Sequence, residues 1–202
     1  APVNLDITAV GADADGTVTK VEVYANGSLL ATDTSAPYAA TWTNAPVGSH
    51  SLTTKAYDNL GATRVTPAIA VVVNALPTVA YTAPADGAVI TLGQAVTLSA
   101  DASDSNGTVS KVDFLADGAL VASDATAPYS ASWTPGTAKA YSLTARATDN
   151  LGGTATTAAR SLIVNALPTV TLTAPTNGLL VHTPATIDLA ATAADSDGTI
   201  AR

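Results

Sequence analysis

Asp104-Ser105-Asn106-Gly107-Thr108-Val109-Ser110-Lys111 is the stretch that decides the fold, because the chain contains it three times. The first copy is Asp13-Ala14-Asp15-Gly16-Thr17-Val18-Thr19-Lys20, and the third is Asp195-Ser196-Asp197-Gly198-Thr199-Ile200-Ala201-Arg202. The two intervals are equal, since 104 − 13 = 91 and 195 − 104 = 91. A fixed period indicates that one structural unit has been copied.

Each copy has the pattern of a tight turn followed by a strand. The first Asp can accept a hydrogen bond from the backbone two residues on, and the Gly accepts a positive φ. The residues after the Gly alternate between polar and apolar, as in a half-buried strand. An EF-hand loop also begins in this way, but it needs a glutamate at its twelfth position. Leu115 and Tyr24 stand there, which excludes an EF-hand.

The rest of the period also predicts strands joined by turns. After the first turn, Val21 and Val23 alternate with the outward-facing Lys20 and Glu22. The hairpin signal Asn26-Gly27 follows, and Asp117-Gly118 takes its place 91 residues later. No sustained helical periodicity is present, and turn signals recur at the spacing of an all-β sandwich. We therefore predict tandem β-sandwich domains with a 91-residue repeat.

The domain boundaries follow from the repeated joint Asn-Ala-Leu-Pro at 74–77 and 165–168. Residues 1–74 form a repeat that lacks its first strand, residues 75–165 form a complete repeat, and residues 166–202 begin a third. The joint contains no Gly/Ser-rich linker and is too short for free flexing.

The composition excludes several classes of function. The formal net charge is −8 with only 8 Lys+Arg. A chain this acidic is unsuited to binding nucleic acid or an anionic membrane surface. No cysteine is present, so the chain has neither disulfides nor thiol chemistry. No apolar run approaches the roughly 18 residues of a membrane helix, so we expect no membrane insertion in this segment.

Four aromatic residues recur in register, and we predict that they are core anchors. Tyr38 and Trp42 stand 91 residues before Tyr129 and Trp133. Their partners on the same strand face are apolar, so both tryptophans are expected to be mostly buried. The residues expected around them are Leu98, Val112 and Leu143 or their equivalents. Exposed tryptophans would instead suit glycan stacking, for which Tyr24, Tyr57 and Tyr81 are the other candidates.

Neither histidine recurs in register, because Tyr141 stands opposite His50 and Thr91 opposite His182. No Ser/His/Asp set recurs either, so we predict that the chain is not an enzyme.

Calcium is the one cofactor that the sequence suggests. Asp104, Asn106, Asp149 and Asn150 lie in turns that a sandwich could bring together, and their oxygens are suitable ligands. The simpler interpretation, which we favour, is that these residues only serve their turns.

Several motifs in fixed order closely resemble tandem bacterial immunoglobulin-like domains of secreted or cell-surface proteins. They are the repeated turn, the Asn/Asp-Gly hairpin, Ala-Pro-Tyr-x-Ala-x-Trp-Thr at 127–134, and Leu-Thr-x-Arg-Ala-x-Asp-Asn-x-Gly at 143–152. The resemblance implies immunoglobulin-like sandwiches and an extracellular or cell-surface location in adhesins, stalks or modular secreted enzymes. It implies no activity. The cysteine pair of antibody domains is absent, so packing alone must hold the core.

The first functional hypothesis is a structural spacer or stalk repeat of a long extracellular bacterial protein, whose partners are neighbouring repeats. One alternative is an adhesive module that binds glycans or a receptor. The other is a subunit of a head-to-tail filament, in which residues 166–182 of one copy complete the first repeat of the next by strand addition. The overlap of residues 183–202 with 1–20 counts against the filament, so a longer covalent array is favoured.

Overall fold

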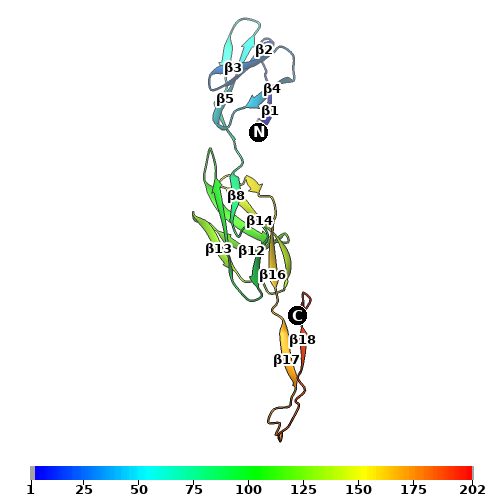
Figure 1. Ribbon diagram of the computed structural model, residues 1–202. Coiled ribbons are helices and arrows are strands. Elements are labelled where there is room, and N and C mark those ends of the chain that lie inside the picture. The colour runs from blue at the N-terminus through cyan, green and yellow to red at the C-terminus, as the bar shows by residue number, and fades with distance from the viewer. Residues whose placement is uncertain (1–2, 202) are drawn as a thin grey trace. The chain divides into compact units, whose positions relative to one another are not determined.

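The computed structural model describes residues 3–201, which form two compact units. Unit 1 comprises the chain up to Leu76 together with the loop Asp104–Thr108, and unit 2 comprises Pro77–Ser103 and the chain from Val109 onward. Every regular element of the described residues is a strand, which confirms the all-β prediction (Figure 1). Among these residues, none forms a helix with the length and apolar character needed to cross a membrane.

Unit 2 contains a sandwich of two sheets. The smaller sheet has the strand order β13-β10-β8, and the larger has the order β12-β11-β14-β16-β9, with β15 also paired to β14. Neighbouring strands are antiparallel except β9 and β16, which are parallel. The strands are β8 (Thr78–Ala83), β9 (Ala88–Thr91), β10 (Val96–Ser103), β11 (Val109–Ala116), β12 (Ala119–Asp124), β13 (Tyr129–Trp133), β14 (Lys139–Asp149), β15 (Thr154–Thr156) and β16 (Arg160–Asn165).

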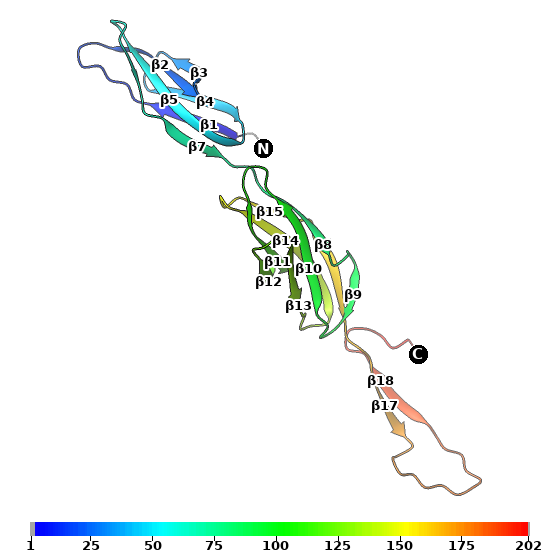
Figure 2. The ribbon, with the colours of Figure 1, turned by 90° about the vertical axis from the view of Figure 1, so that its left-hand side faces the viewer.

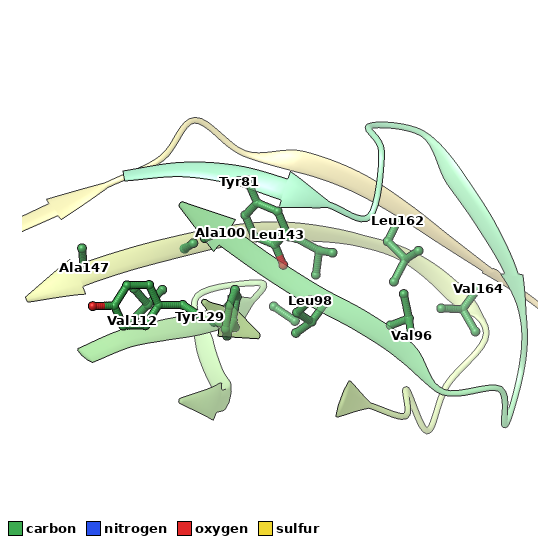
Figure 3. Packing of buried hydrophobic residues seen from close by; sticks show 13 residues of the cluster. Tyr81, Val96, Leu98, Ala100, Val112, Tyr129, Leu143, Ala147, Leu162 and Val164 are labelled. Atoms are coloured by element: carbon green, nitrogen blue, oxygen red, sulfur yellow. The ribbon is translucent and has the colours of Figure 1, made fainter. Parts of the chain in front are cut away.

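The core of unit 2 lies between its two sheets. Leu98 from the smaller sheet meets Leu143 and Leu162 from the larger one (Figure 3). These residues and Phe114 are fully buried because alternate side chains of each strand point inward. Each such side chain contributes roughly 1.5–3 kcal/mol of burial free energy, so this cluster is the main source of stability in a chain without disulfides.

Unit 1 has the same plan with fewer strands. Its smaller sheet contains only β1 and β4, and its larger sheet has the order β3-β2-β5-β6, with β7 also paired to β5 (Figure 2). Several strands match those of unit 2 at a spacing of 91 residues; for example, β2 begins at 18 and β11 at 109. The strands are β1 (Val3–Ala9), β2 (Val18–Ala25), β3 (Ser28–Asp33), β4 (Tyr38–Ala45), β5 (Gly48–Asp58), β6 (Thr63–Val65) and β7 (Ile69–Val73).

The hairpin turns have the backbone that their sequence predicts. The φ angles are 50° at Asn26 and 80° at Gly27, and 51° at Asp117 and 81° at Gly118. Two successive positive values match the right-handed twist of the flanking strands, so these turns set the register of β2 with β3 and of β11 with β12.

Unit 1 has no counterpart of β8 or β9 among the described residues. In unit 2, β8 pairs with β10 and β9 pairs with β16. In unit 1, β1 pairs with β4 alone, so one edge of β1 is open.

The last two strands, β17 (Thr169–Ala174) and β18 (Ala190–Ala194), pair only with each other, as Figures 1 and 2 show. The backbone contains no strand at 74–77, where the sequence places the first joint. In the second joint, at 165–168, only Asn165 belongs to a strand, as the last residue of β16.

Candidate functional site

The third residue of the repeated turn binds the backbone of a joint. Asn106 Oδ1 accepts a hydrogen bond from the backbone N–H of Ala75 at 2.9 Å, and Asn106 Nδ2 donates to the carbonyl of Val73 at 3.5 Å. The same contact recurs 91 residues later. The carboxylate oxygens of Asp197 accept from the N–H of Ala166 at 3.0 and 3.1 Å. Two joints of the same sequence are therefore held by the same position of the repeated turn.

The sequence analysis missed this role, since it assigned Asn106 to its turn or to calcium. The signal was present, because Asn-Ala-Leu-Pro and the Asn or Asp of the turn recur together. Their partnership is a contact across 31 residues, and local sequence rules do not predict such contacts.

The first residue of the repeated turn acts as predicted. Asp104 Oδ1 accepts from the N–H of Asn106 at 3.3 Å, and Asp195 Oδ1 accepts from the N–H of Asp197 at 3.4 Å. Asp104 Oδ2 is buried and has no hydrogen-bond donor among the described residues.

Asp149 closes the other predicted turn. Its Oδ1 atom accepts from the N–H groups of Leu151 and Gly153, each at 2.8 Å. Asp58 does the same in unit 1, where Oδ1 accepts from Leu60 at 2.8 Å and Ala62 at 2.7 Å. These carboxylates satisfy turn amides that would otherwise lack partners.

In unit 1 the two kinds of turn lie side by side. Asn59, the equivalent of Asn150, accepts a hydrogen bond through Oδ1 from the N–H of Thr17 at 2.8 Å, and its own N–H donates to the Thr17 carbonyl at 3.0 Å. Asp13 Oδ2 and Asn59 Oδ1 both approach Gly16 too closely to leave room for a side chain there. A larger residue at position 16 would therefore displace the Asn59 and Asp13 side chains from these positions.

Calcium binding by Asp104, Asn106, Asp149 and Asn150 stays a prediction. Across residues 3–201, no group of three or more His, Cys, Asp or Glu side chains is placed to hold a metal ion. Asp149 Oδ1 and Asn106 Oδ1 already accept backbone hydrogen bonds, whereas Asp104 Oδ2 accepts none. Comparing the melting temperature in millimolar calcium and in chelator tests the site, because a ligand of the folded state raises stability.

A buried carboxylate lies in the larger sheet of unit 2. Asp113 is only 1% exposed, and it binds Lys111 Nζ at 2.8 Å, Arg146 Nη2 at 3.0 Å and Ser123 Oγ at 2.8 Å. Burial raises the pKa of Asp113, but the hydrogen bonds from Lys111, Arg146 and Ser123 outweigh it, so the pKa lies below its ordinary value. Asp113 is therefore a paired and ionised group.

Glu22 holds the equivalent place in unit 1. It accepts from Lys20 Nζ at 2.6 Å, from the Tyr57 hydroxyl at 2.8 Å and from the Tyr24 hydroxyl. The hydrogen bond from Lys20, followed by those from Tyr24 and Tyr57, lowers the pKa of Glu22 to about 2. The sequence placed Glu22 on the outward face but did not reveal its partners, which come from two strands.

Tyr38 and Tyr129, two of the four predicted core anchors, are buried. The hydroxyl of Tyr38 donates to the Val18 carbonyl at 3.0 Å, and that of Tyr129 donates to the Val109 carbonyl at 3.2 Å. Each tyrosine therefore fills the core with its ring and satisfies a backbone acceptor with its tip.

The two tryptophans lie near the margin of the sandwich and are partly buried, and their role as core anchors stays a prediction. Trp133 packs against the core cluster and meets Tyr141 edge-on at a centroid distance of 5.1 Å. Trp42 meets His50 in the same way at 4.8 Å. Both tryptophans are only partly buried because β13 and β4 are edge strands, so no further strand of the same sheet covers one side of each side chain.

The remaining aromatic and histidine candidates also have structural contacts. Tyr81 is buried and meets Phe114 edge-on at 5.9 Å. Tyr24 and Tyr57 donate to Glu22, as described above. His50 Nε2 lies 2.7 Å from the Pro46 carbonyl oxygen, and Nδ1 lies 3.1 Å from Asn26 Nδ2.

Comparison with known proteins gives one family. The profile of the bacterial Ig domain matches residues 1–54, 77–156 and 168–202. No curated protein sequence matches the chain.

Among solved structures, the fibronectin(III)-like modules of Clostridium thermocellum CbhA are 32% identical, with a TM-score of 0.50. The match covers 82% of this chain and 87% of that chain. A chimeric titin Z1Z2 tandem is 21% identical, with a TM-score of 0.37, and the match covers 82% of this chain and 92% of that chain. The Bacteroides ovatus protein SGBP-B, solved with a mixed-linkage heptasaccharide, is 17% identical, with a TM-score of 0.30, and the match covers 79% of this chain and 40% of that chain.

Proposed function

Because the chain belongs to the bacterial Ig domain family, we propose that it is a structural spacer that holds other modules of an extracellular bacterial protein at a distance. The proposal gives the chain no catalytic role. Its partners are neighbouring domains of the same kind.

The observation that carries the proposal is the pair of joint contacts. Asn106 binds the backbone of Ala75, and Asp197 binds the backbone of Ala166, at the same position of the repeated turn. In a flexible linker the backbone amides are hydrogen-bonded to water. In each of these two joints, the alanine N–H instead donates to a side chain of the repeated turn. A module whose task is to keep a distance needs such a restrained joint.

The composition supports an extracellular setting. Charged residues make up only 12% of the chain, and its formal net charge is −8. Thr, Ser and Asn therefore supply much of the polar surface, and an acidic surface discourages binding to nucleic acid.

The spacer role is tested by measuring a distance distribution across the first joint. Leu29 and Leu120 are exposed residues of β3 and β12, and the chain has no cysteine, so spin labels at Leu29→Cys and Leu120→Cys are specific. We expect a narrow distribution that broadens when Asn106→Ala is added, while Ser105→Ala leaves it unchanged. A wild-type distribution as broad as that of the Asn106→Ala chain would contradict the proposal.

The adhesive alternative has less support. Glycan stacking needs exposed aromatic faces, but Tyr81 is buried, Tyr24 and Tyr57 are engaged with Glu22, and Trp133 packs against the core.

A further inference from the structure

The dipeptide Asn-Gly occurs three times in the chain, and each occurrence has an Asp-Gly 91 residues away. The pairs are Asn26-Gly27 with Asp117-Gly118, Asn106-Gly107 with Asp197-Gly198, and Asn177-Gly178 with Asp86-Gly87. An asparagine before a glycine is open to loss of its side-chain amide, because the glycine has no side chain that hinders its backbone nitrogen. The product of that loss is aspartate, which the fold already holds at the equivalent positions.

The conversion has two steps, and water is its only other reactant. The glycine nitrogen gives its proton to solvent and attacks Cγ of the asparagine. A nitrogen–carbon bond forms, the bond from Cγ to Nδ2 breaks, and Nδ2 takes up protons from solvent and leaves as ammonia. Water then opens the cyclic imide at one of its two carbonyls, which gives aspartate or isoaspartate. The attack is intramolecular, so its rate depends on how the fold positions the glycine nitrogen and Cγ.

The hairpin turn at Asn26 opposes this attack. Asn26 and Gly27 have φ angles of 50° and 80°, as in a type I′ turn, and ψ of the first central residue is then about +30°. That value places the Gly27 nitrogen on the far side of the Cα–C bond from Cβ, so the nitrogen points away from the side chain. Pairing of Ala25 with Ser28 closes the turn, and the Asn26 N–H donates to the Ser51 carbonyl at 2.8 Å. Conversion of Asn26 therefore requires the hairpin to open.

Asn106 lies in a turn that does not restrain its glycine in this way. Residues 104–108, between β10 and β11, have no strand pairing. Asn106 does not share the positive φ of Asn26. Among residues 3–201, the Gly107 N–H has no hydrogen-bond acceptor. Rotation of the Gly107 nitrogen towards the Asn106 side chain therefore breaks no hydrogen bond of that N–H.

The contact of Asn106 with the first joint favours the same step. Negative charge develops on Oδ1 when Cγ is attacked, and the Ala75 N–H already donates to that oxygen at 2.9 Å. A donor fixed where charge develops stabilises the transition state. The departing Nδ2 is held only by a 3.5 Å contact with the Val73 carbonyl, at the outer limit of a hydrogen bond. The joint thus polarises the side-chain carbonyl and holds the leaving group weakly.

We propose that Asn106 is a self-modification site, at which loss of the amide gives the first joint the carboxylate that the second joint already has. The Asp197 carboxylate accepts from the Ala166 N–H at 3.0 and 3.1 Å, so an acid at this position of the turn is compatible with the joint contact. The aspartate product at position 106 keeps an acceptor for the Ala75 N–H, loses the donor to the Val73 carbonyl and adds one negative charge.

The isoaspartate product acts differently on the joint. Its main chain runs through the former side chain, so one carbon is added to the backbone, and its carboxylate is attached directly to Cα. That shorter carboxylate no longer reaches the Ala75 N–H, so the contact with the joint is lost. The inference concerns the chemistry of the joint and goes beyond the spacer role. The conversion rate is measured independently of the distance distribution, so either idea can fail alone.

The experiment follows conversion of the full chain at neutral pH over weeks, folded in buffer and unfolded in urea. A protease digest separates the Asn-Gly sites, and mass spectrometry scores the change from amide to acid at each. In the folded chain we expect Asn106 to convert at least about tenfold faster than Asn26, because the hairpin must open first. In urea the two rates should be similar, since each Asn-Gly is followed by a hydroxyl residue. A folded chain that converts Asn106 no faster than Asn26 would overturn the proposal.

Two matched variants test whether the place in the fold sets the rate. Asp117→Asn puts an Asn-Gly into the equivalent hairpin of unit 2, and Asp197→Asn puts one into the turn at the second joint. Both substitutions keep the size of the side chain. We expect the Asp197→Asn site to convert at about the rate of Asn106 and the Asp117→Asn site to convert at least about tenfold more slowly. Equal rates at the two new sites, or a difference between Asn106 and Asn26 that persists in urea, would refute the role of the structure.

Amide exchange at Ala75 then shows what each product does to the joint. The aspartate fraction of the aged chain should protect the Ala75 N–H as well as an Asn106→Asp chain does, whereas the isoaspartate fraction should exchange as fast as Asn106→Ala. Ala166 in the same samples is the internal control, because Asp197 binds it throughout. An aspartate fraction that exchanges at Ala75 as fast as Asn106→Ala would contradict the equivalence of the two joints.

Discussion

Asn106 accepts through its Oδ1 atom the hydrogen bond that the backbone N–H of Ala75 donates at 2.9 Å. The N–H of Ala75 lies in a stretch without strand pairing, so a side chain supplies the acceptor that a sheet would otherwise provide. The Asp197 carboxylate does the same for Ala166, which shows that the third residue of the repeated turn has a role outside the turn.

Asn106→Ala should accelerate amide exchange at Ala75 by about fivefold, because it removes a hydrogen bond with a net value of about 1 kcal/mol. Exchange measured by NMR on the full chain tests this. Ser105→Ala, one residue earlier in the same loop, is the control and should leave the rate unchanged. Equal rates in the wild type and Asn106→Ala would show that the contact is not formed in solution.

Tyr129→Phe should lower the free energy of unfolding of unit 2 by about 1 kcal/mol. The substitution keeps the buried ring but leaves the Val109 carbonyl without the hydroxyl that now donates to it at 3.2 Å. Urea unfolding monitored by the fluorescence of Trp133 gives the value. Tyr141→Phe is a suitable comparison, because that hydroxyl donates to the Thr137 carbonyl at an exposed site and its loss should cost less.

Phe114→Ala should destabilise unit 2 by about 3–5 kcal/mol, the range for a large aromatic residue in a core, because Phe114 is fully buried. Trp133→Ala should cost less, since that side chain is only partly buried and lies on an edge strand. Urea unfolding by circular dichroism compares the two variants. The reverse order would mean that the tryptophan, and not Phe114, is the main anchor.

Stability of unit 1 should fall as the pH is lowered from about 4.5 to about 2, in part because of Glu22. Its pKa is lowered from 4.5 to about 2 in the folded chain, so the folded state favours the ionised form. This contribution is fully present above the unfolded pKa and is lost as the pH falls towards the folded one. The melting temperature of Glu22→Gln should therefore be lower than that of the wild type at pH 7 and should depend less on pH below 4.5.

Asp15→Asn is the control for charge, since Asp15 is an exposed acid in the first turn of the same unit. We expect its melting temperature to follow the wild-type curve between pH 4.5 and pH 2. A Glu22→Gln chain whose curve parallels that of the wild type would contradict the role given to Glu22.

Much of the fold was predictable from local rules. Asn26-Gly27 and Asp117-Gly118 adopt the positive φ values that their residue types favour, and the alternation in 109–116 and 143–147 gave the inward faces correctly. The exposure of the tryptophans was not predictable in the same way. Alternation assigns Trp133 to the inner face, but its exposure depends on whether its strand lies at the edge of a sheet.

The sequence by itself determined the succession of strands and turns along the chain, because these depend on residue type and period-two alternation. Only the tertiary structure decided which distant groups meet. Ala75 and Asn106 are 31 residues apart, and the partners of Glu22 come from β2 and β5. A strand's alternation specifies which face is apolar, but the partner that covers that face is set by pairing between strands, which depends on the whole domain.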